Sequence, residues 1–209
     1  MIAISSDVHG EADTFEACLD HARSRGATEH WLLGDIVSGT HPDRSACLAR
    51  QRCTVVVAGN HDMAVSRTGP SYIAHGEWDA VHGLELVERT RTALDVDQHA
   101  WLAGLPHQHV TDDAHCTHAT AWSPIDFLET VDEVAAHSIL ADRRLAFVGH
   151  HHELFPWKWQ DELIARPPLD TWLELDAARW VICVGSLVDD GTYALWDPAR
   201  DRLSWQVVE

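Results

Sequence analysis

Positively charged residues are scarce in this sequence. Its 209 residues include 15 lysines and arginines against 33 aspartates and glutamates, which gives a formal net charge of −18 at pH 7. A chain this acidic is repelled at long range by the phosphate backbone of DNA or RNA. We therefore exclude a nucleic-acid polymer as the main partner, although bound cations could still attract a small phosphorylated molecule locally.

Paired cysteines and long hydrophobic runs are also missing. The five cysteines are odd in number and none lies in a C-x-x-C pair, a pattern typical of reduced thiols rather than of a disulfide framework. No uninterrupted apolar run approaches the ~20 residues that cross a bilayer. The start, MIAISSDVHG, has no basic segment of the kind that opens a signal peptide. We expect a cytoplasmic protein with no membrane contact, and the sequence leaves a homo-oligomer open.

Short apolar segments alternate with helical patterns in the first part of the chain. The segments IAIS (2–5), HWLLGD (30–35) and TVVVAG (54–59) predict strands, and helical patterns separate them at 11–26 and 43–52. This order is typical of a parallel sheet with helices packed on it. Residues 76–105, which include Trp78 and Trp101, also have a helical pattern.

The second half of the chain predicts further strands. Two are expected at 113–119 and 144–150, with a helix at 130–142 between them. Three short runs follow at 180–186, 192–197 and 203–208, for which we expect an antiparallel region or a second sheet. The chain shows no repeat, low-complexity tract or linker, and its length suits one domain. We expect a single domain over residues 1–209.

Acidic, amide and imidazole side chains follow five of the predicted strands. Because ligands of open α/β sheets bind beyond the carboxyl ends of the strands, we expect these side chains to meet. They are Asp7, His9, Asp35, Asn60, His61, Asp62, His118 and the run from His150 to His152. Oxygen and nitrogen donors without thiolates suit ions such as Mn²⁺, Fe²⁺, Zn²⁺ or Ni²⁺. The donors are too many for one ion, so the pattern indicates two.

The spacing suggests how the donors divide. One ion could take Asp7, His9 and a histidine of the run, the other Asn60, His118 and a second histidine, with Asp35 bridging. Residues two apart, as in D-x-H and H-x-H, would converge if the backbone runs nearly extended. His151 would then point away, and His118 is preferred to His115 because it lies nearer the expected strand end. Each short motif alone is a common turn; the ordered set is what indicates a metal centre.

The ordered motifs D-x-H, G-D, G-N-H-D, H and G-H-x-H resemble those of the calcineurin-like metallophosphoesterase superfamily, and more closely its small bacterial phosphoesterases. The resemblance implies an α/β fold in which a two-sheet β-sandwich is flanked by helices, in four αββα layers. It implies that Asp7, His9, Asp35 and His152 hold a first ion, and that Asp35, Asn60, His118 and His150 hold a second. It also implies that His61 faces the substrate and that Asp62 orients the His61 ring.

The sequence departs from the family pattern at a few positions. Glu11, Ala119, His151 and the pair Cys183–Val184 replace residues that are usual there. None of these changes removes a ligand, so they bear on the substrate pocket rather than on the chemistry. Trp122, Trp157 and Trp159 follow ligand segments and could line that pocket, although packing roles are favoured for all three.

The function that follows is a metal-dependent phosphohydrolase, in its most concrete form a phosphodiesterase for small phosphorylated substrates. Two divalent ions, manganese before iron, nickel or zinc, would share a bridging hydroxide as the nucleophile, and His61 would act as general acid. Phosphomonoesterase and nucleotide pyrophosphatase activities stay open because the same centre supports them. The alternative that is not an enzyme is a non-catalytic binding scaffold of the same fold, and the presence of His61 argues against it.

Overall fold

The computed structural model describes residues 1–66, 80–159 and 165–208. Its first sheet has the strand order β3-β2-β1-β10-β11-β8. The strands are β1 (Ile2–Ser5), β2 (Glu29–Leu32), β3 (Val55–Val56), β8 (Leu173–Glu174), β10 (Thr192–Asp197) and β11 (Arg202–Val207). The first three are parallel, as the strand–helix rhythm predicts, and β10 pairs antiparallel with β1.

The second sheet has the order β4-β5-β6-β9-β7. Its strands are β4 (Gln108–Val110), β5 (Ala114–Thr117), β6 (Leu145–Val148), β7 (Leu154–Lys158) and β9 (Trp180–Val184). The central strands β5, β6 and β9 are parallel, and the two edge strands pair antiparallel with them. Parallel strands have their carboxyl ends at the same edge of the sheet, and ligand-binding sites form at that edge.

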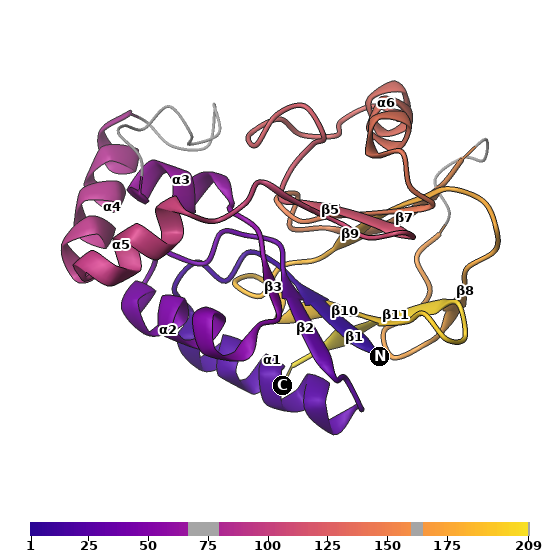
Figure 1. The fold of residues 1–209 in the computed structure, drawn as a ribbon, viewed down its shortest axis with the longest axis horizontal. Coiled ribbons are helices and arrows are strands. Elements are labelled where there is room, and N and C mark those ends of the chain that lie inside the picture. The colour runs from indigo at the N-terminus through magenta and orange to yellow at the C-terminus, as the bar shows by residue number, and fades with distance from the viewer. Residues whose placement is uncertain (67–79, 160–164, 209) are drawn as a thin grey trace.

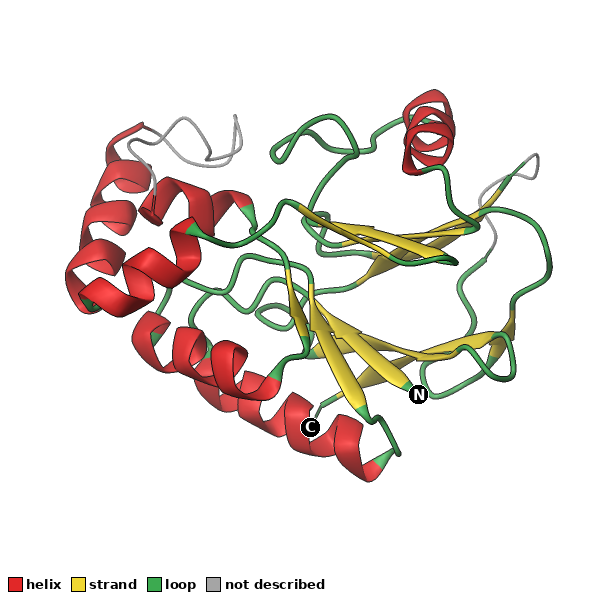
Figure 2. Ribbon diagram, in the orientation of Figure 1, coloured by secondary structure: helices red, strands yellow, loops and turns green. Residues whose placement is uncertain are grey.

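Helices cover the outer faces of the two sheets (Figure 1). Helices α1 (Ala12–Ser24) and α2 (Pro42–Arg52) lie on the first sheet, and α6 (Val131–Ala141) lies on the second. Helices α3 (Asn60–Ser66), α4 (Ala80–Ala93) and α5 (Val96–Ala103) pack together at one end of the molecule. Figure 2 shows the resulting layers of helix, sheet, sheet and helix, which confirms the expected αββα architecture.

The alternation of side chains along the strands builds this layering. Leu145 and Phe147 of β6 pack between the two sheets, whereas their neighbours Ala146 and Val148 pack in the core under α6. The same alternation in the other strands fills the space between sheets with large side chains, including the fully buried Trp205. A period of two residues is what a strand covered on both faces requires.

The helices carry the signals that their sequence predicts. In α1 the side chains of Phe15, Cys18, Leu19 and Ala22 are buried on one face. Helix α6 begins after Thr130, whose side chain accepts a hydrogen bond from the backbone N–H of Glu133. The Glu133 carboxylate in turn accepts one from the backbone N–H of Thr130. This reciprocal cap satisfies N–H groups that the first turn leaves without partners.

Some elements differ from the expectation. Strands β4, β7 and β8 were not predicted, and the third strand is shorter than expected, since β3 ends at Val56 and α3 begins at Asn60. The three C-terminal strands divide between the sheets: β9 lies parallel to β6, while β10 and β11 join the first sheet. The region expected to be helical at 76–105 forms α4 and α5, and Trp78 lies outside the described residues. Among the helices described, none combines the length and apolarity that crossing a bilayer requires.

Candidate metal centre

The seven predicted metal ligands lie together where strands of both sheets end. Asp7 and His9 follow β1, Asp35 follows β2, Asn60 begins α3, His118 follows β5, and His150 and His152 follow β6. Six of them, all except Asn60, fall together with His61 into three groups whose donor atoms lie within 4.8 Å of one another. The groups are Asp7 with His9 and His152, His9 with Asp35 and His61, and Asp35 with His118 and His150.

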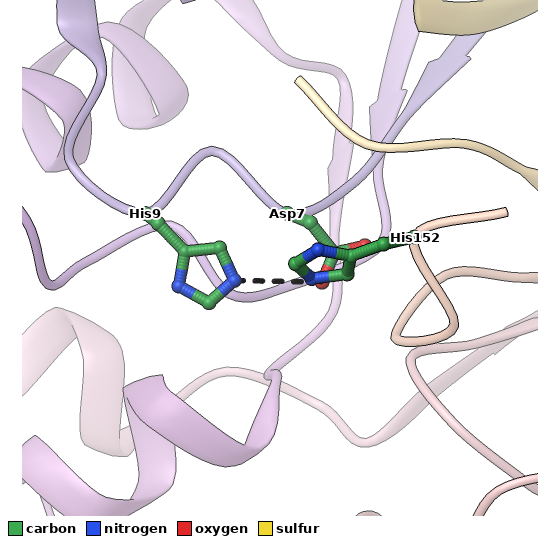
Figure 3. A group of neighbouring side chains, drawn as sticks. All are labelled: Asp7, His9 and His152. Carbon is green, nitrogen blue, oxygen red and sulfur yellow. Dashed lines mark ion pairs between the residues drawn. The ribbon is translucent and has the colours of Figure 1, made fainter. Parts of the chain in front are cut away.

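The first group centres on the buried carboxylate of Asp7. Its Oδ1 atom lies 3.2 Å from Nε2 of His152 and 3.8 Å from Nε2 of His9. Figure 3 shows both imidazole rings directed toward this carboxylate. Burial raises the pKa of Asp7, but the neighbouring His152 and His9 rings outweigh burial and lower it well below its usual value. Asp7 is therefore ionised at neutral pH.

Asp35 connects this first group to the group of Asp35, His118 and His150, which we call the second group. Its Oδ2 atom lies 3.6 Å from Nε2 of His9 and 3.3 Å from Nε2 of His118. Burial raises the pKa of Asp35, but the charge on His118 outweighs burial and lowers it below its ordinary range. A carboxylate between two sets of donors is the position expected of a bridging ligand.

His118 and Asn60 complete the second group. The Nε2 atom of His118 lies 2.9 Å from Oδ1 of Asn60, and its ring centroid lies 5.0 Å from that of His150. Burial lowers the pKa of His118, but the charge on Asp35 raises it to about 9. Burial lowers the pKa of His150 to about 3, so this ring is neutral at pH 7 and has a nitrogen lone pair available for a metal ion.

Three of the histidines have their Nδ1 atoms held by the surrounding chain. The partners are Ser38 Oγ for His9 at 2.9 Å, the Leu33 carbonyl for His118 at 2.7 Å, and Asp189 Oδ2 for His152 at 2.5 Å. Each ring therefore turns its Nε2 atom toward the carboxylates. Metal-binding histidines are oriented in this way by a second hydrogen bond.

His150 has the opposite orientation. Its Nε2 atom lies 3.3 Å from the carbonyl of Ile125, and its ring stacks on Phe127 with centroids 4.2 Å apart. The contact with Ile125 leaves Nδ1 as the nitrogen that faces the group. Two buried atoms of the site, Asp7 Oδ1 and His9 Nε2, have no hydrogen-bond partner. Such atoms are costly unless something binds them, so this donor set fits divalent cations.

The backbone reaches this arrangement through left-handed conformations. Positive φ angles occur at Asp7 (58°), His9 (45°), Asp35 (51°), His150 (64°) and His152 (57°). The expected extended backbone in the D-x-H and H-x-H segments is thus incorrect: the chain turns at these five residues, and the turns direct their side chains toward one place. Such conformations cost of order 1–3 kcal/mol each and gather at functional sites.

Two glycines allow the loops to approach closely. A Cβ atom on Gly59 would lie 2.1 Å from Oδ1 of Asp35, and one on Gly149 would lie 1.9 Å from Oγ of Ser6. Both distances are far inside van der Waals contact. A residue without a Cβ atom is therefore required at both positions.

His61 lies beside the first and second groups, close to His9 and Asp35, and lines the cavity. Its backbone N–H donates to Oδ1 of Asp35 at 2.8 Å, and its ring meets the ring of His9 edge-on with centroids 4.7 Å apart. Burial lowers the pKa of His61 to about 4, against the opposing charge of Asp35. The Nε2 atom lies 4.0 Å from Oδ2 of Asp35, so distance alone would also allow His61 to act as a ligand.

Asp62 does not have the role expected for it. We expected its carboxylate to orient the ring of His61, but among the described residues it accepts from the backbone N–H groups of Ile36, Val37 and Gly59, at 3.0, 3.2 and 2.9 Å. Burial raises the pKa of Asp62 to about 7. Asp62 joins the loop after Asp35 to the loop before Asn60, so it fixes the backbone of the site.

A cavity of about 520 Å³ opens over the donors. Phe127, Leu86 and Val188 supply apolar surface, and Asp189 and Arg89 supply charge. His151 also lines this cavity and lies 3.4 Å from the backbone N–H of Leu128. His115 points elsewhere, toward the Ala141 carbonyl and Gln108.

The aromatic wall of the cavity was not predicted. Trp157 is buried in the core under α6 and Trp159 packs against that core, which agrees with the favoured packing role. Trp122 is 43% exposed and lines a different cavity. Phe127 forms the wall, and nothing in its local sequence marks it out. Ser38 and Asp189 were missed for the same reason, because serine and aspartate are common in turns.

Known proteins resemble this chain in sequence and in fold. A family model described as calcineurin-like phosphoesterase matches residues 1–185. The uncharacterized protein MJ0912 of Methanocaldococcus jannaschii is 27% identical over 162 residues, which cover 73% of this chain and 62% of that protein. This chain therefore matches less than two thirds of the length of that curated relative.

Two solved structures extend the comparison. The crystal structure of a metallophosphoesterase from Sphaerobacter thermophilus is 25% identical, with a TM-score of 0.84, and the match covers 100% of this chain and 87% of that one. The hypothetical protein PH1004 from Pyrococcus horikoshii OT3 is 18% identical with a TM-score of 0.74, over 100% of this chain and 88% of that one. The second likeness concerns the fold alone.

Proposed function

This chain belongs to the calcineurin-like phosphoesterase family, a family of phosphoric ester hydrolases, and we propose that it acts as a metal-dependent phosphodiesterase on small phosphorylated substrates. The observation that carries the proposal is the meeting of two donor groups at Asp35, whose Oδ2 atom lies within 3.6 Å of His9 and 3.3 Å of His118. A carboxylate shared in this way suits two adjacent cations better than one.

The ligands divide between the two ions as the family pattern implies. Asp7, His9, Asp35 and His152 would hold the first ion, and Asp35, Asn60, His118 and His150 the second. Manganese is the proposed metal, and iron, nickel or zinc would also suit these donors. When bound, such a pair supplies an activated water and neutralises charge on the phosphoryl oxygens.

His61 is proposed to protonate the leaving oxygen. Its ring lines the cavity and its side chain is 13% exposed, so it can reach a bound ester. The hydrogen bond from its backbone to Asp35 fixes its position relative to the donors. A phosphate anion beside the ring would raise the pKa of His61, because a nearby negative charge favours the imidazolium form. Proton donation of this kind typically contributes 10²–10⁴-fold to a rate.

Phosphomonoester hydrolysis could use the same residues, and the test separates the two activities. We expect the purified protein with added Mn²⁺ to hydrolyse bis(p-nitrophenyl) phosphate faster than p-nitrophenyl phosphate, and to lose activity with a chelator. Asp35→Asn should abolish turnover while the protein stays folded. Faster hydrolysis of the monoester would overturn the diesterase assignment. Absence of turnover with manganese, iron, nickel and zinc alike would favour the scaffold alternative.

The five cysteines are all free. Reduced thiols support the expectation of a reducing compartment, and we propose a cytoplasmic location.

A further inference from the structure

We propose that Arg89 forms a binding site for a second phosphate or other anionic group of the substrate, apart from the phosphate that is hydrolysed. The inference rests on the proposed function, since it assigns the scissile phosphate to the metal centre. It names a feature of the substrate class: a molecule with two anionic groups joined by an organic linker.

Two cavities meet at Arg89. The cavity over the metal centre, of about 520 Å³, is lined on this side by Gly39, Leu86 and Arg89. A neighbouring cavity of about 320 Å³ is lined by Gly39 and Arg89 again, together with Thr40, Pro42, Thr90 and Ala93. A ligand held at the metal centre could therefore extend past Arg89 into the second cavity.

Helix α4 forms a continuous wall along both cavities. Leu86, Arg89 and Ala93 are spaced three and four residues apart, so they lie on one face of the helix. Leu86 lines the first cavity, Ala93 the second, and Arg89 both. Seven residues of helix span about 10 Å, which is enough length for an organic group and a second phosphate.

The charge on Arg89 is available to a ligand. Its neighbour Arg91 donates to the carbonyls of Val65 and Ala64 and pairs with Glu88. Arg89 is exposed, and within residues 1–66, 80–159 and 165–208 its side chain makes no hydrogen bond or ion pair.

Two acidic side chains in the wall of the first cavity, Glu11 and Asp189, already contact other residues. The carboxylate of Glu11 accepts from Thr40, and that of Asp189 contacts His152. Arg89 is the one lysine or arginine that lines either cavity in the described part of the chain. In a protein of net charge −18, a solvent-facing guanidinium at this junction provides a local attraction for an anion.

The test compares two ligands that differ by one anionic group. Hexylphosphonate and hexane-1,6-diphosphonate have C–P bonds, so a phosphoesterase does not hydrolyse them. Calorimetric titration of the manganese-loaded protein should show the diphosphonate binding about tenfold more tightly, as expected for a charge-assisted hydrogen bond. Arg89→Gln should remove this advantage. Arg89→Lys should retain part of it, because lysine keeps the positive charge but lacks the planar guanidinium group that can donate two parallel hydrogen bonds.

A matched variant controls for the change in net charge. Arg50→Gln removes an exposed arginine from α2 that lines neither cavity, and it should keep the tenfold advantage. Equal affinity of the two ligands for the wild type, or an advantage that survives in Arg89→Gln, would overturn the proposal. Hydrolysis of bis(p-nitrophenyl) phosphate is measured in parallel and should change less than twofold in Arg50→Gln, because Arg50 lines neither cavity. If the wild type hydrolyses no ester, the proposed function fails, while the phosphonate affinities still decide the role of Arg89.

Discussion

Asp189 holds the ring of His152: its Oδ2 atom lies 2.5 Å from Nδ1 of the imidazole. The opposite ring nitrogen, Nε2, lies 3.2 Å from the buried Asp7 carboxylate. The ring is thus fixed between an outer carboxylate and an inner one. Pairs of this kind orient a metal-binding histidine and increase its basicity.

Asp189→Asn should weaken metal binding without unfolding the protein. The amide keeps the size of the side chain but loses the charge that orients His152, a change that typically costs 10–100-fold in metal affinity. Titration of the metal-free protein with Mn²⁺ measures the effect. Asp190→Asn is the matched control, because Asp190 is the exposed neighbour with the same charge. Equal affinities of the two variants would show that Asp189 does not act on the metal site.

His61→Ala should retain metal and lose turnover. If His61 is the proton donor and not a ligand, the metal content stays at two ions per chain while the rate falls by about 10²–10⁴-fold. The loss should be smallest for nitrophenyl esters, because their leaving group needs little protonation. Elemental analysis and steady-state rates on nitrophenyl and alkyl esters provide the measurement. A fall in metal content would instead place His61 among the ligands, as its distance from Asp35 also permits.

Gly149→Ala should destabilise the protein severely. The added Cβ would lie 1.9 Å from Oγ of Ser6 and 3.0 Å from Oδ2 of Asp7, so the loop would have to move. We expect a loss of about 3 kcal/mol or more in the free energy of unfolding, since overpacking in a rigid site costs 1–3 kcal/mol and occasionally more. Urea unfolding measures it.

Gly104→Ala is the control for the loss of a glycine. Gly104 ends α5 with φ at −89°, and an added Cβ would come no closer than 3.5 Å to its neighbours. That substitution should be neutral or stabilising by about 0.4–1 kcal/mol. If both variants unfolded at the same urea concentration, close approach at Gly149 would not be a constraint.

The buried His30 should contribute to acid sensitivity. Its Nε2 atom lies 2.7 Å from Oγ of Ser5, and burial lowers the pKa of His30 to about 3. Because the folded-state pKa lies below the unfolded value of about 6.5, only the unfolded chain gains a proton between these values. The stabilising effect of a neutral His30 is therefore complete above pH 6.5 and declines as the pH falls, by about 1.4 kcal/mol per pH unit.

Urea unfolding between pH 4.5 and 6.5 tests this dependence. His30→Gln should lower stability overall but reduce the slope against pH by roughly 1.4 kcal/mol per unit. His41→Gln, at an exposed position before α2, should leave the slope unchanged. Identical slopes in the wild type and His30→Gln would contradict a neutral buried imidazole.

The parallel strands β1 to β3 and the ordered donors from Asp7 to His152 were predictable from the sequence. Apolar runs with intervening helical patterns indicate parallel strands, and such strands must bring their carboxyl ends to one edge. The strand partners were not predictable in the same way. Strands β9 and β10 are buried along their whole length, and buried strands of similar composition can pair in either sheet. The structure places β9 in the second sheet and β10 in the first.

The sequence by itself indicated the family, because its ordered motifs depend on residue type and order, and the resemblance to that family implied the αββα layering and the expected metal ligands. Tertiary structure decided how the donors are held. The left-handed backbone at Asp7 and His152, the contact of Asp189 with His152 and the backbone role of Asp62 depend on segments far apart in the chain. Distances between such segments are set by packing of the whole core, which no local pattern specifies.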